Sequence, residues 1–185
     1  MSALTIYSED QQQIGVTSRD FATIVEKLNA LGVRFERWQA ATEFSADAEP
    51  ETVLAAYHDA IDRLKRQYGF QSVDVISLKA DHPDKQQIRQ KFLAEHIHRD
   101  YEVRFFVEGR GLFYLHVGDH VYAVLCEQGD LLSVPANTTH WFDMGEKPNL
   151  KCIRLFTTPD GWVAEFTGNK IADKFPGFDQ YLATL

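Results

Sequence analysis

The segment His96-Ile-His98-Arg-Asp-Tyr-Glu102, together with His140 far along the chain, constrains this sequence more than any other feature. Side chains at positions i and i+2 of a strand leave the same face, so His96 and His98 can direct their ring nitrogens to one point. Imidazoles and a carboxylate of this kind can enclose one divalent transition metal ion. A metal centre formed by His96, His98, Glu102 and His140 is therefore the leading functional hypothesis.

The spacing between His98 and Glu102 requires a bend in the chain. A straight strand would separate the two residues by roughly 13 Å at about 3.3 Å per residue, which is long for two ligands of one ion. Beyond the bend, which we expect at residues 99–101, apolar and polar residues alternate and place Glu102 and Arg104 on one strand face. Arg104 is thus expected beside the metal. The alternative is that the histidines are ordinary surface residues, since the sequence between them and Glu102 is polar enough for a solvated loop.

Length and charge limit the classes of protein and partner. The 185 residues, of which 44% are hydrophobic, fit one domain covering 1–185. The net charge of −8, without a basic stripe, argues against nucleic acid and membrane partners and favours a small molecule. The sequence has no long apolar run and no leader pattern, so we expect a cytoplasmic protein. Cys126 and Cys152 are expected to be reduced and buried, without a function.

Helices are expected in the first half of the chain. Apolar residues recur at helical spacing after the capping-box sequence Thr17-Ser-Arg-Asp20 and stop at Gly32. A second helix is expected from Pro50 to Gly69 and a third, shorter one after Pro83.

Short strands are expected from residue 102 onward, at 103–107, 112–117, 121–126, 131–134, 141–142, 152–156 and 162–166, with two more at 33–38 and 73–78. Gly118-Asp119 is a two-residue hairpin signal. The pattern predicts a mainly β protein, a sandwich or barrel, with helices from the N-terminal half packed outside.

Two motifs in this sequence resemble those of the cupin superfamily. The first is His-x-His, three or four residues, Glu, six residues and Gly, which residues 96–109 fit. The second is matched by Gly129, Pro135 and His140. There are departures, because the sequence has Gln90, Asn137 and Met144 where the superfamily pattern has Gly, Gly and Asn. Asn137 can adopt positive φ almost as glycine does. The resemblance implies a jelly-roll β-barrel.

Longer blocks resemble the acireductone dioxygenase family. They are Gly32-Val-Arg-Phe-Glu-Arg-Trp38, Glu102-Val-Arg-Phe-Phe-Val-Glu-Gly109, Ser133-Val-Pro-Ala136, Thr139-His-Trp-Phe-Asp-Met-Gly145 and Phe166-Thr-Gly168. The resemblance implies an enzyme of methionine salvage that cleaves the enediol 1,2-dihydroxy-3-oxo-5-(methylthio)pent-1-ene with O2. In this family, Fe(II) gives 4-methylthio-2-oxobutanoate and formate, whereas Ni(II) gives 3-(methylthio)propanoate, formate and carbon monoxide. We expect one Fe(II) or Ni(II) per chain and a monomer.

Several further residues are candidates for the site. Three imidazoles and one carboxylate leave two positions of an octahedral ion open, which suits a ligand with two oxygens. Arg104 is the candidate catalytic residue, stabilising the substrate anion. Arg154 is either a substrate contact or half of a salt bridge. The remaining candidates are Phe92, Phe142 and Trp162 for an apolar substrate tail, although such aromatics are more often core, and Tyr101 beside the ligand Glu102.

Two other functions remain open at this point. A cupin sugar-phosphate isomerase could hold an enediolate with the same ligands, but it would need a cradle of cationic and hydroxyl side chains for the phosphate. A sensor or storage protein could carry the metal for structure alone. The remaining histidines, His58, His82, His116 and His120, have no ligand spacing and are expected at the surface or at strand edges.

Overall fold

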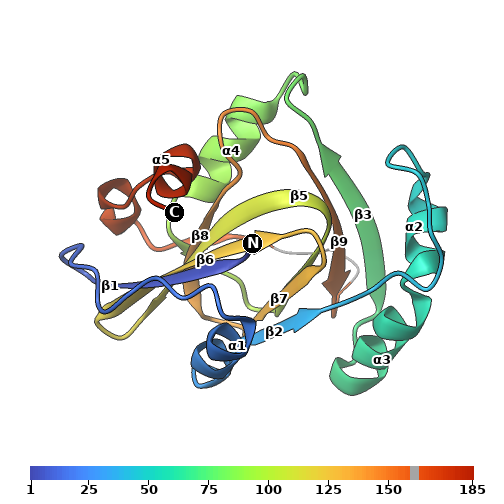
Figure 1. Ribbon diagram of the computed structural model, residues 1–185, viewed down its shortest axis with the longest axis horizontal. Coiled ribbons are helices and arrows are strands. Elements are labelled where there is room, and N and C mark those ends of the chain that lie inside the picture. The colour runs from blue at the N-terminus through green and yellow to red at the C-terminus, as the bar shows by residue number, and fades with distance from the viewer. Residues whose placement is uncertain (159–162) are drawn as a thin grey trace.

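The computed structural model describes residues 1–158 and 163–185. Strands form the centre of the molecule and helices lie outside them (Figure 1). The elements in chain order are β1 (Ala3–Ser8), α1 (Phe21–Asn29), β2 (Arg34–Arg37), α2 (Pro50–Ala56), α3 (His58–Tyr68), β3 (Ser72–Leu78), α4 (Lys85–Leu93), β4 (His96–Ile97), β5 (Glu102–Val117), β6 (His120–Glu127), β7 (Asp130–Val134), β8 (Thr139–Asp143), β9 (Leu150–Phe156), β10 (Glu165–Phe166), the 3-10 helix η1 (Ile171–Lys174) and α5 (Phe178–Ala183).

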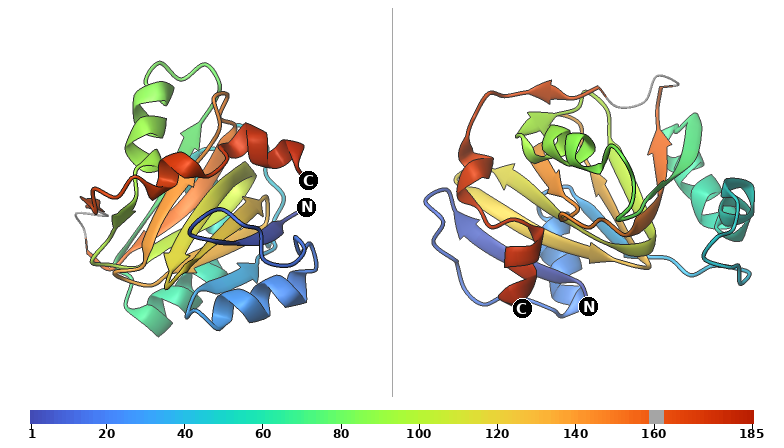
Figure 2. Two further views of the ribbon diagram at one scale, coloured as in Figure 1. Left: turned by 90° about the vertical axis from the view of Figure 1, so that its left-hand side faces the viewer. Right: turned by 90° about the horizontal axis from the view of Figure 1, so that it is seen from above.

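The long strand β5 belongs to both halves of the β structure. Its first part pairs with β7 and β9, and its second part pairs with β6 and β8. One half of the structure therefore runs β2-β7-β5-β9-β3, and the other runs β1-β6-β5-β8-β4-β10. Among the described strands the hydrogen-bonded ladder does not close into a ring. The mainly β fold with flanking helices is confirmed (Figure 2).

The change of partner along β5 occurs at Gly109. The register shifts between Phe106 and Glu108, and Gly109 has a φ of +71°. A Cβ atom at this position would lie 1.7 Å from the carbonyl oxygen of Asn149. Only glycine fits both the positive φ and this close approach. The strand can therefore bend between the two halves without being interrupted.

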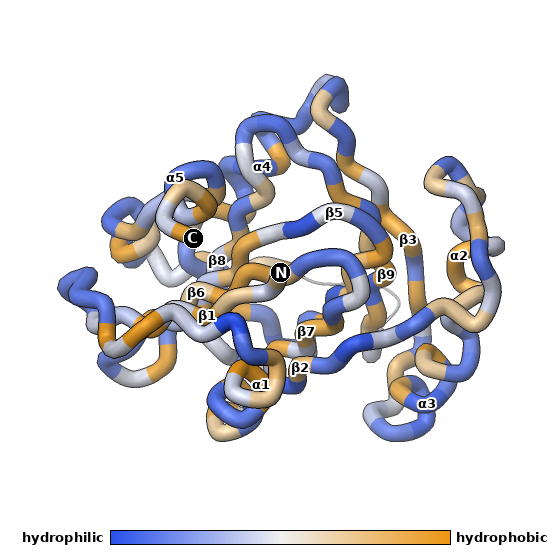
Figure 3. The backbone as a smooth tube through the Cα atoms, in the orientation of Figure 1, coloured by the Kyte–Doolittle hydropathy of each residue, from blue (hydrophilic) through white to orange (hydrophobic). Residues whose placement is uncertain are grey.

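Hydrophobic residues gather along the central strands, whereas hydrophilic residues are frequent in the helices and loops around them (Figure 3). Helix α1 begins after Asp20, whose carboxylate accepts the backbone N–H of Thr23 at 2.8 Å. Its buried residues Ile24 and Leu28 join the core cluster that contains Phe35 of β2. In the described part of the chain, no helix is long and apolar enough to span a membrane.

The segment expected as one helix from Pro50 to Gly69 is two helices, so that prediction was wrong. The break lies at Tyr57, which has φ −113° and ψ 15°. Its ring packs against Phe105 of β5, with ring centres 4.7 Å apart, and the preceding carbonyl of Ala56 accepts the N–H of Ala41. Tertiary contacts thus override the helical periodicity at this position.

The expected strands differ from the observed ones in three places. The strands expected at 103–107 and 112–117 are one strand, β5, and β1 was not expected. The strand expected at 162–166 contains β10 at Glu165–Phe166, while its first residue, Trp162, lies outside the described residues. β10 pairs with β4 and places this late segment beside the histidines at 96 and 98.

Candidate metal centre

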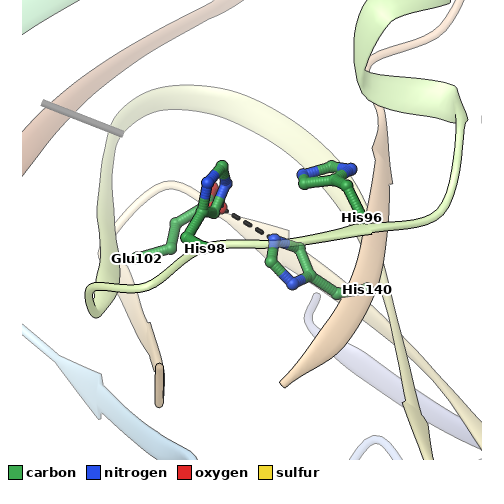
Figure 4. A group of neighbouring side chains, drawn as sticks. All are labelled: His96, His98, Glu102 and His140. Atoms are coloured by element: carbon green, nitrogen blue, oxygen red, sulfur yellow. Dashed lines mark hydrogen bonds and ion pairs between the residues drawn. The ribbon is translucent and has the colours of Figure 1, made fainter. Parts of the chain in front are cut away.

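Four side chains expected to bind a metal lie together in the structure (Figure 4). They are His96 on β4, His98 just after it, Glu102 at the start of β5 and His140 on β8. Each offers one ligand atom, and these atoms all lie within 4.8 Å of one another. All four side chains are buried. The structure therefore brings the predicted constellation together, and the alternative of ordinary surface histidines does not hold.

Sheet register and one bend produce this convergence. His96 and His140 are directly paired on neighbouring antiparallel strands, so their side chains share a face. The chain bends at residues 99–100, between β4 and β5, as the spacing predicted. The Asp100 carboxylate accepts the N–H groups of Tyr101 at 2.7 Å and Thr157 at 2.9 Å, and so holds the bend.

The three imidazoles are oriented by backbone carbonyl groups. The Nδ1 atoms of His96, His98 and His140 lie 2.7, 2.9 and 2.7 Å from the carbonyl oxygens of Ala94, Val163 and Thr138. A carbonyl oxygen can only accept, so Nδ1 carries the proton of each ring and Nε2 faces the site. This is the tautomer in which histidine binds a metal through Nε2.

The nitrogen and oxygen atoms that face the site suit a positively charged ligand. The Nε2 atoms of His98 and His140 lie 3.1 and 2.9 Å from the same oxygen, Oε2 of Glu102. Contacts this short between an imidazole nitrogen and a carboxylate need a positive charge between them, either a proton on Nε2 or a metal ion. Burial lowers the pKa of His98, but its bond to Glu102 outweighs burial and raises that pKa, so without metal a proton supplies the charge there. A divalent metal ion supplies that charge, and the residues present suit an octahedral or tetrahedral ion with histidine and carboxylate ligands.

Burial and charge set the protonation of the site. Burial alone would raise the pKa of Glu102, but Arg104, His140 and His98 together hold that pKa well below its usual value. Burial and the neighbouring His140 lower the pKa of His96 to about 4. The carboxylate is therefore ionised and His96 is neutral at neutral pH, which are the forms that bind metals.

Arg104 lies at the site, on the strand face that the alternation predicted. Its Nη2 donates to Oε1 of Glu102 at 2.9 Å, on the carboxylate oxygen opposite to the one facing the imidazoles. The guanidinium carbon lies 4.4 Å from the ring centre of Phe142, 5.3 Å from that of Phe113 and 5.8 Å from that of Phe92. The arginine is thus held by one carboxylate and by aromatic faces.

The remaining candidate residues are Arg154, Tyr101 and Trp162. Arg154 is paired with Arg104 across β5 and β9, and its Nε donates to Asp74 at 2.9 Å, as the salt-bridge alternative requires. Tyr101 packs against the rings of Tyr68 and Phe70 in the core. Trp162 lies outside the described residues.

Sequence reasoning missed the contribution of residues 163–167. Besides the Val163 carbonyl on His98, the ring of Phe166 packs against His96 with centres 5.9 Å apart. Thr167 donates its hydroxyl to the buried carboxylate of Glu95 at 2.6 Å. These contacts depend on the pairing of β10 with β4, for which the sequence contains no local signal.

His116 was expected at the surface or at a strand edge, but it lies on β5 between β6 and β8. It is mostly buried, with Nδ1 2.7 Å from Glu95 Oε2 and Nε2 2.9 Å from Glu9 Oε1. The imidazole therefore bridges two carboxylates, one of them on the residue that precedes His96.

A two-part β structure with three histidines and a glutamate converging on its inner face defines a metal-binding protein of the cupin type. Residues 3–164 match the profile of the ARD/ARD′ family. The chain belongs to this family, and the membership that the sequence blocks indicated is confirmed.

Individual relatives agree over nearly the whole chain. The acireductone dioxygenase of Methylococcus capsulatus is 60% identical over 182 residues, which are 98% of this chain and 98% of that protein. The acireductone dioxygenase of Aquifex aeolicus is 54% identical, over 97% of this chain and 98% of its own length. A solved structure of acireductone dioxygenase from Bacillus anthracis, with a cadmium ion in its active centre, is 30% identical and superposes with a TM-score of 0.77, covering 90% of this chain and 98% of that one.

Proposed function

We propose that this chain is a metal-dependent acireductone dioxygenase of methionine salvage, which cleaves 1,2-dihydroxy-3-oxo-5-(methylthio)pent-1-ene with O2. The observation that carries the proposal is the buried convergence of three Nε2 atoms and one carboxylate. The family relatives named acireductone dioxygenase support the choice of substrate. The dioxygenase chemistry follows from the same comparison.

His96, His98, Glu102 and His140 would hold one Fe(II) or Ni(II). A metal bound there would act as a Lewis acid that stabilises and orients the enediol anion through two oxygens. The protein holds the three imidazoles in one tautomer through carbonyl contacts, so little reorganisation is needed when the metal binds.

Arg104 would stabilise the negative charge of the substrate. Its guanidinium is nearly fully buried, and an electrostatic interaction is stronger in such surroundings than in water. Phe142 and Phe113 lie against it and limit its movement. The cation is therefore positioned before the substrate arrives, which is the arrangement that favours catalysis.

The product would depend on the metal, with Fe(II) giving 4-methylthio-2-oxobutanoate and formate, and Ni(II) giving 3-(methylthio)propanoate, formate and carbon monoxide. Nothing in the ligand set selects between the two ions. Ni(II) binds such ligands more tightly than Fe(II), so the supply of metal in the cell would decide the occupancy.

The test is anaerobic reconstitution of the metal-free chain with Fe(II) or Ni(II), followed by addition of the synthetic acireductone and O2. We expect O2 uptake and metal-dependent products from the wild type, and none from His140→Ala at the same metal concentration. A wild-type protein that binds metal but consumes no O2 with this enediol would contradict the proposal and support a sensor or storage role. The isomerase alternative would need more cationic and hydroxyl side chains around a phosphate, and of the two arginines considered for that cradle Arg154 is taken up by Asp74.

A further inference from the structure

The pairing of four strands places a row of side chains across the metal-facing side of the sheet. Leu115 of β5 pairs with His140 of β8, His140 pairs with His96 of β4, and His96 pairs with Phe166 of β10. Directly paired residues of antiparallel strands project from the same face. Phe166 therefore lies on the same face as two of the metal-binding histidines, at the end of the row.

The two ends of this row differ in exposure. Leu115 is fully buried, whereas Phe166 is 53% exposed. β10 lies at the edge of this half of the β structure among the described strands (Figure 2). Single exposed apolar residues are common and need no explanation by themselves. Phe166 is different because its ring also contacts a metal-binding side chain, with ring centres 5.9 Å apart in an edge-to-face arrangement with His96.

The neighbours of Phe166 hold it in this position. The N–H of Thr167 donates to the carbonyl of Glu95 at 3.1 Å, and its hydroxyl donates to the Glu95 side chain at 2.6 Å. On the other side, Glu165 forms an ion pair with Arg99. The exposed ring is thus attached to a short strand that two hydrogen bonds tie to Glu95, so a ligand contacting it would meet a surface already in place.

The other aromatic residues described at the site offer little free surface. Phe142 is only 2% exposed, and the guanidinium of Arg104 covers it at 4.4 Å. Phe92 is partly buried and packs edge-on against Phe142, with ring centres 6.4 Å apart. Phe166 therefore exposes more ring surface than Phe142 or Phe92 does.

We propose that Phe166 is a specificity-determining residue, whose exposed ring contacts the apolar tail of the metal-bound enediol at the rim of the site. The inference rests on the proposed function, and it adds the part of the site that recognises the tail. Contact with an apolar group of one or two methylene-sized units removes that surface from water, which favours binding of a tailed substrate over a short one.

The experiment compares two enediols, the methylthio acireductone and the same enediol ending in a methyl group in place of the tail. Their dissociation constants are measured without O2 by calorimetry on Ni(II)-loaded protein, and metal content is measured for every variant. Phe166→Ala should weaken binding of the tailed enediol about tenfold, equivalent to about 1.4 kcal/mol. It should change binding of the short enediol less than about twofold, because that ligand makes no tail contact.

Two further variants separate tail recognition from packing. Phe166→Leu keeps an apolar side chain and should recover most of the affinity for the tailed enediol. Ile14→Ala removes another exposed apolar side chain, close to β1 at the opposite edge of the same half of the β structure, and should affect neither ligand.

The outcomes distinguish this inference from the proposed function. If Phe166→Ala weakens both enediols equally, or neither, their affinity ratio is unchanged and the inference is overturned. Loss of metal in this variant would mean that Phe166 only supports His96, and would overturn the inference too. O2 uptake by the wild type is measured in parallel. Its absence with both enediols would defeat the proposed function, whereas the anaerobic affinity ratio decides the role of Phe166 in either case.

Discussion

Replacing Arg104 by methionine should destabilise the metal-free protein strongly. The arginine is 2% exposed and donates to Glu102, which is 4% exposed. Methionine has a similar length and no charge, so the change leaves the Glu102 carboxylate buried without its guanidinium partner. His98 and His140 still face that carboxylate, but on its other oxygen. The variant therefore separates the effect of the cation from the effect of lost volume.

The magnitude follows from the burial of the pair. Removing one partner of a buried ion pair costs about 3–5 kcal/mol, because the remaining charge is left uncompensated. For a chain of this size, each 1 kcal/mol shifts the melting temperature by about 2–4 °C. We therefore expect Arg104→Met to melt roughly 6–20 °C below the wild type in EDTA at pH 7.

The double variant Glu102→Gln/Arg104→Met tests the cause. It removes both charges, and neutral groups of similar volume often replace a buried ion pair with little loss. The double variant should therefore be more stable than Arg104→Met, although it has one more substitution. Thermal unfolding followed by circular dichroism measures all three proteins. A loss of less than about 1 kcal/mol in Arg104→Met, or additive losses in the double variant, would refute the reasoning.

Three other predictions concern the ligands, the fold and the pH dependence of stability. His140→Ala should weaken metal binding at least about a hundredfold in a competitive chelator titration, because it removes a ligand rather than a supporting contact. Gly109→Ala should be less stable to urea than Gly118→Ala by about 1–3 kcal/mol: both have positive φ, but only at Gly109 would the new Cβ overlap a backbone oxygen. Burial lowers the pKa of His116, but its bonds to two glutamates outweigh burial and raise that pKa. The contribution of His116 to the free energy of unfolding should therefore be fully present below about pH 6.5. It should be lost as the pH rises through the folded-state pKa of His116. In His116→Gln that fall should be absent from urea titrations between about pH 6 and 9.

His96, His98, Glu102 and Arg104 could be predicted because their placement follows from local geometry, whereas His140 was indicated by its motif. The strand period places His96 and His98 on one face, and it places Glu102 and Arg104 together on the next strand. The distance between the two pairs required a bend, and the structure has one at residues 99–100. Such rules need only a few consecutive residues, so they hold without knowledge of the rest of the fold.

The surroundings of the site could not be predicted in the same way. Phe166 is near His96 only because Glu165–Phe166 pairs with His96–Ile97, a register between segments about 70 residues apart. The bridging position of His116 likewise depends on Glu95 and Glu9 from two distant segments. The break at Tyr57 has the same origin, because a long-range ring contact decides it. In each case the helical or strand period gives the local conformation but not the partner.

The charges of the site explain why a cation such as Arg104 lies next to the ligands. With a divalent metal bound, the three imidazoles would be neutral, and the single negative charge of Glu102 would be balanced by the single positive charge of Arg104. The two positive charges of the ion would then be left for the bound ligand to offset. A buried centre with this excess is unfavourable when filled by water alone, because burial weakens solvation of charge. In the proposed function an anionic enediol would offset this excess, so a buried Arg104 that cancels the charge of Glu102 favours an anionic substrate over a neutral one.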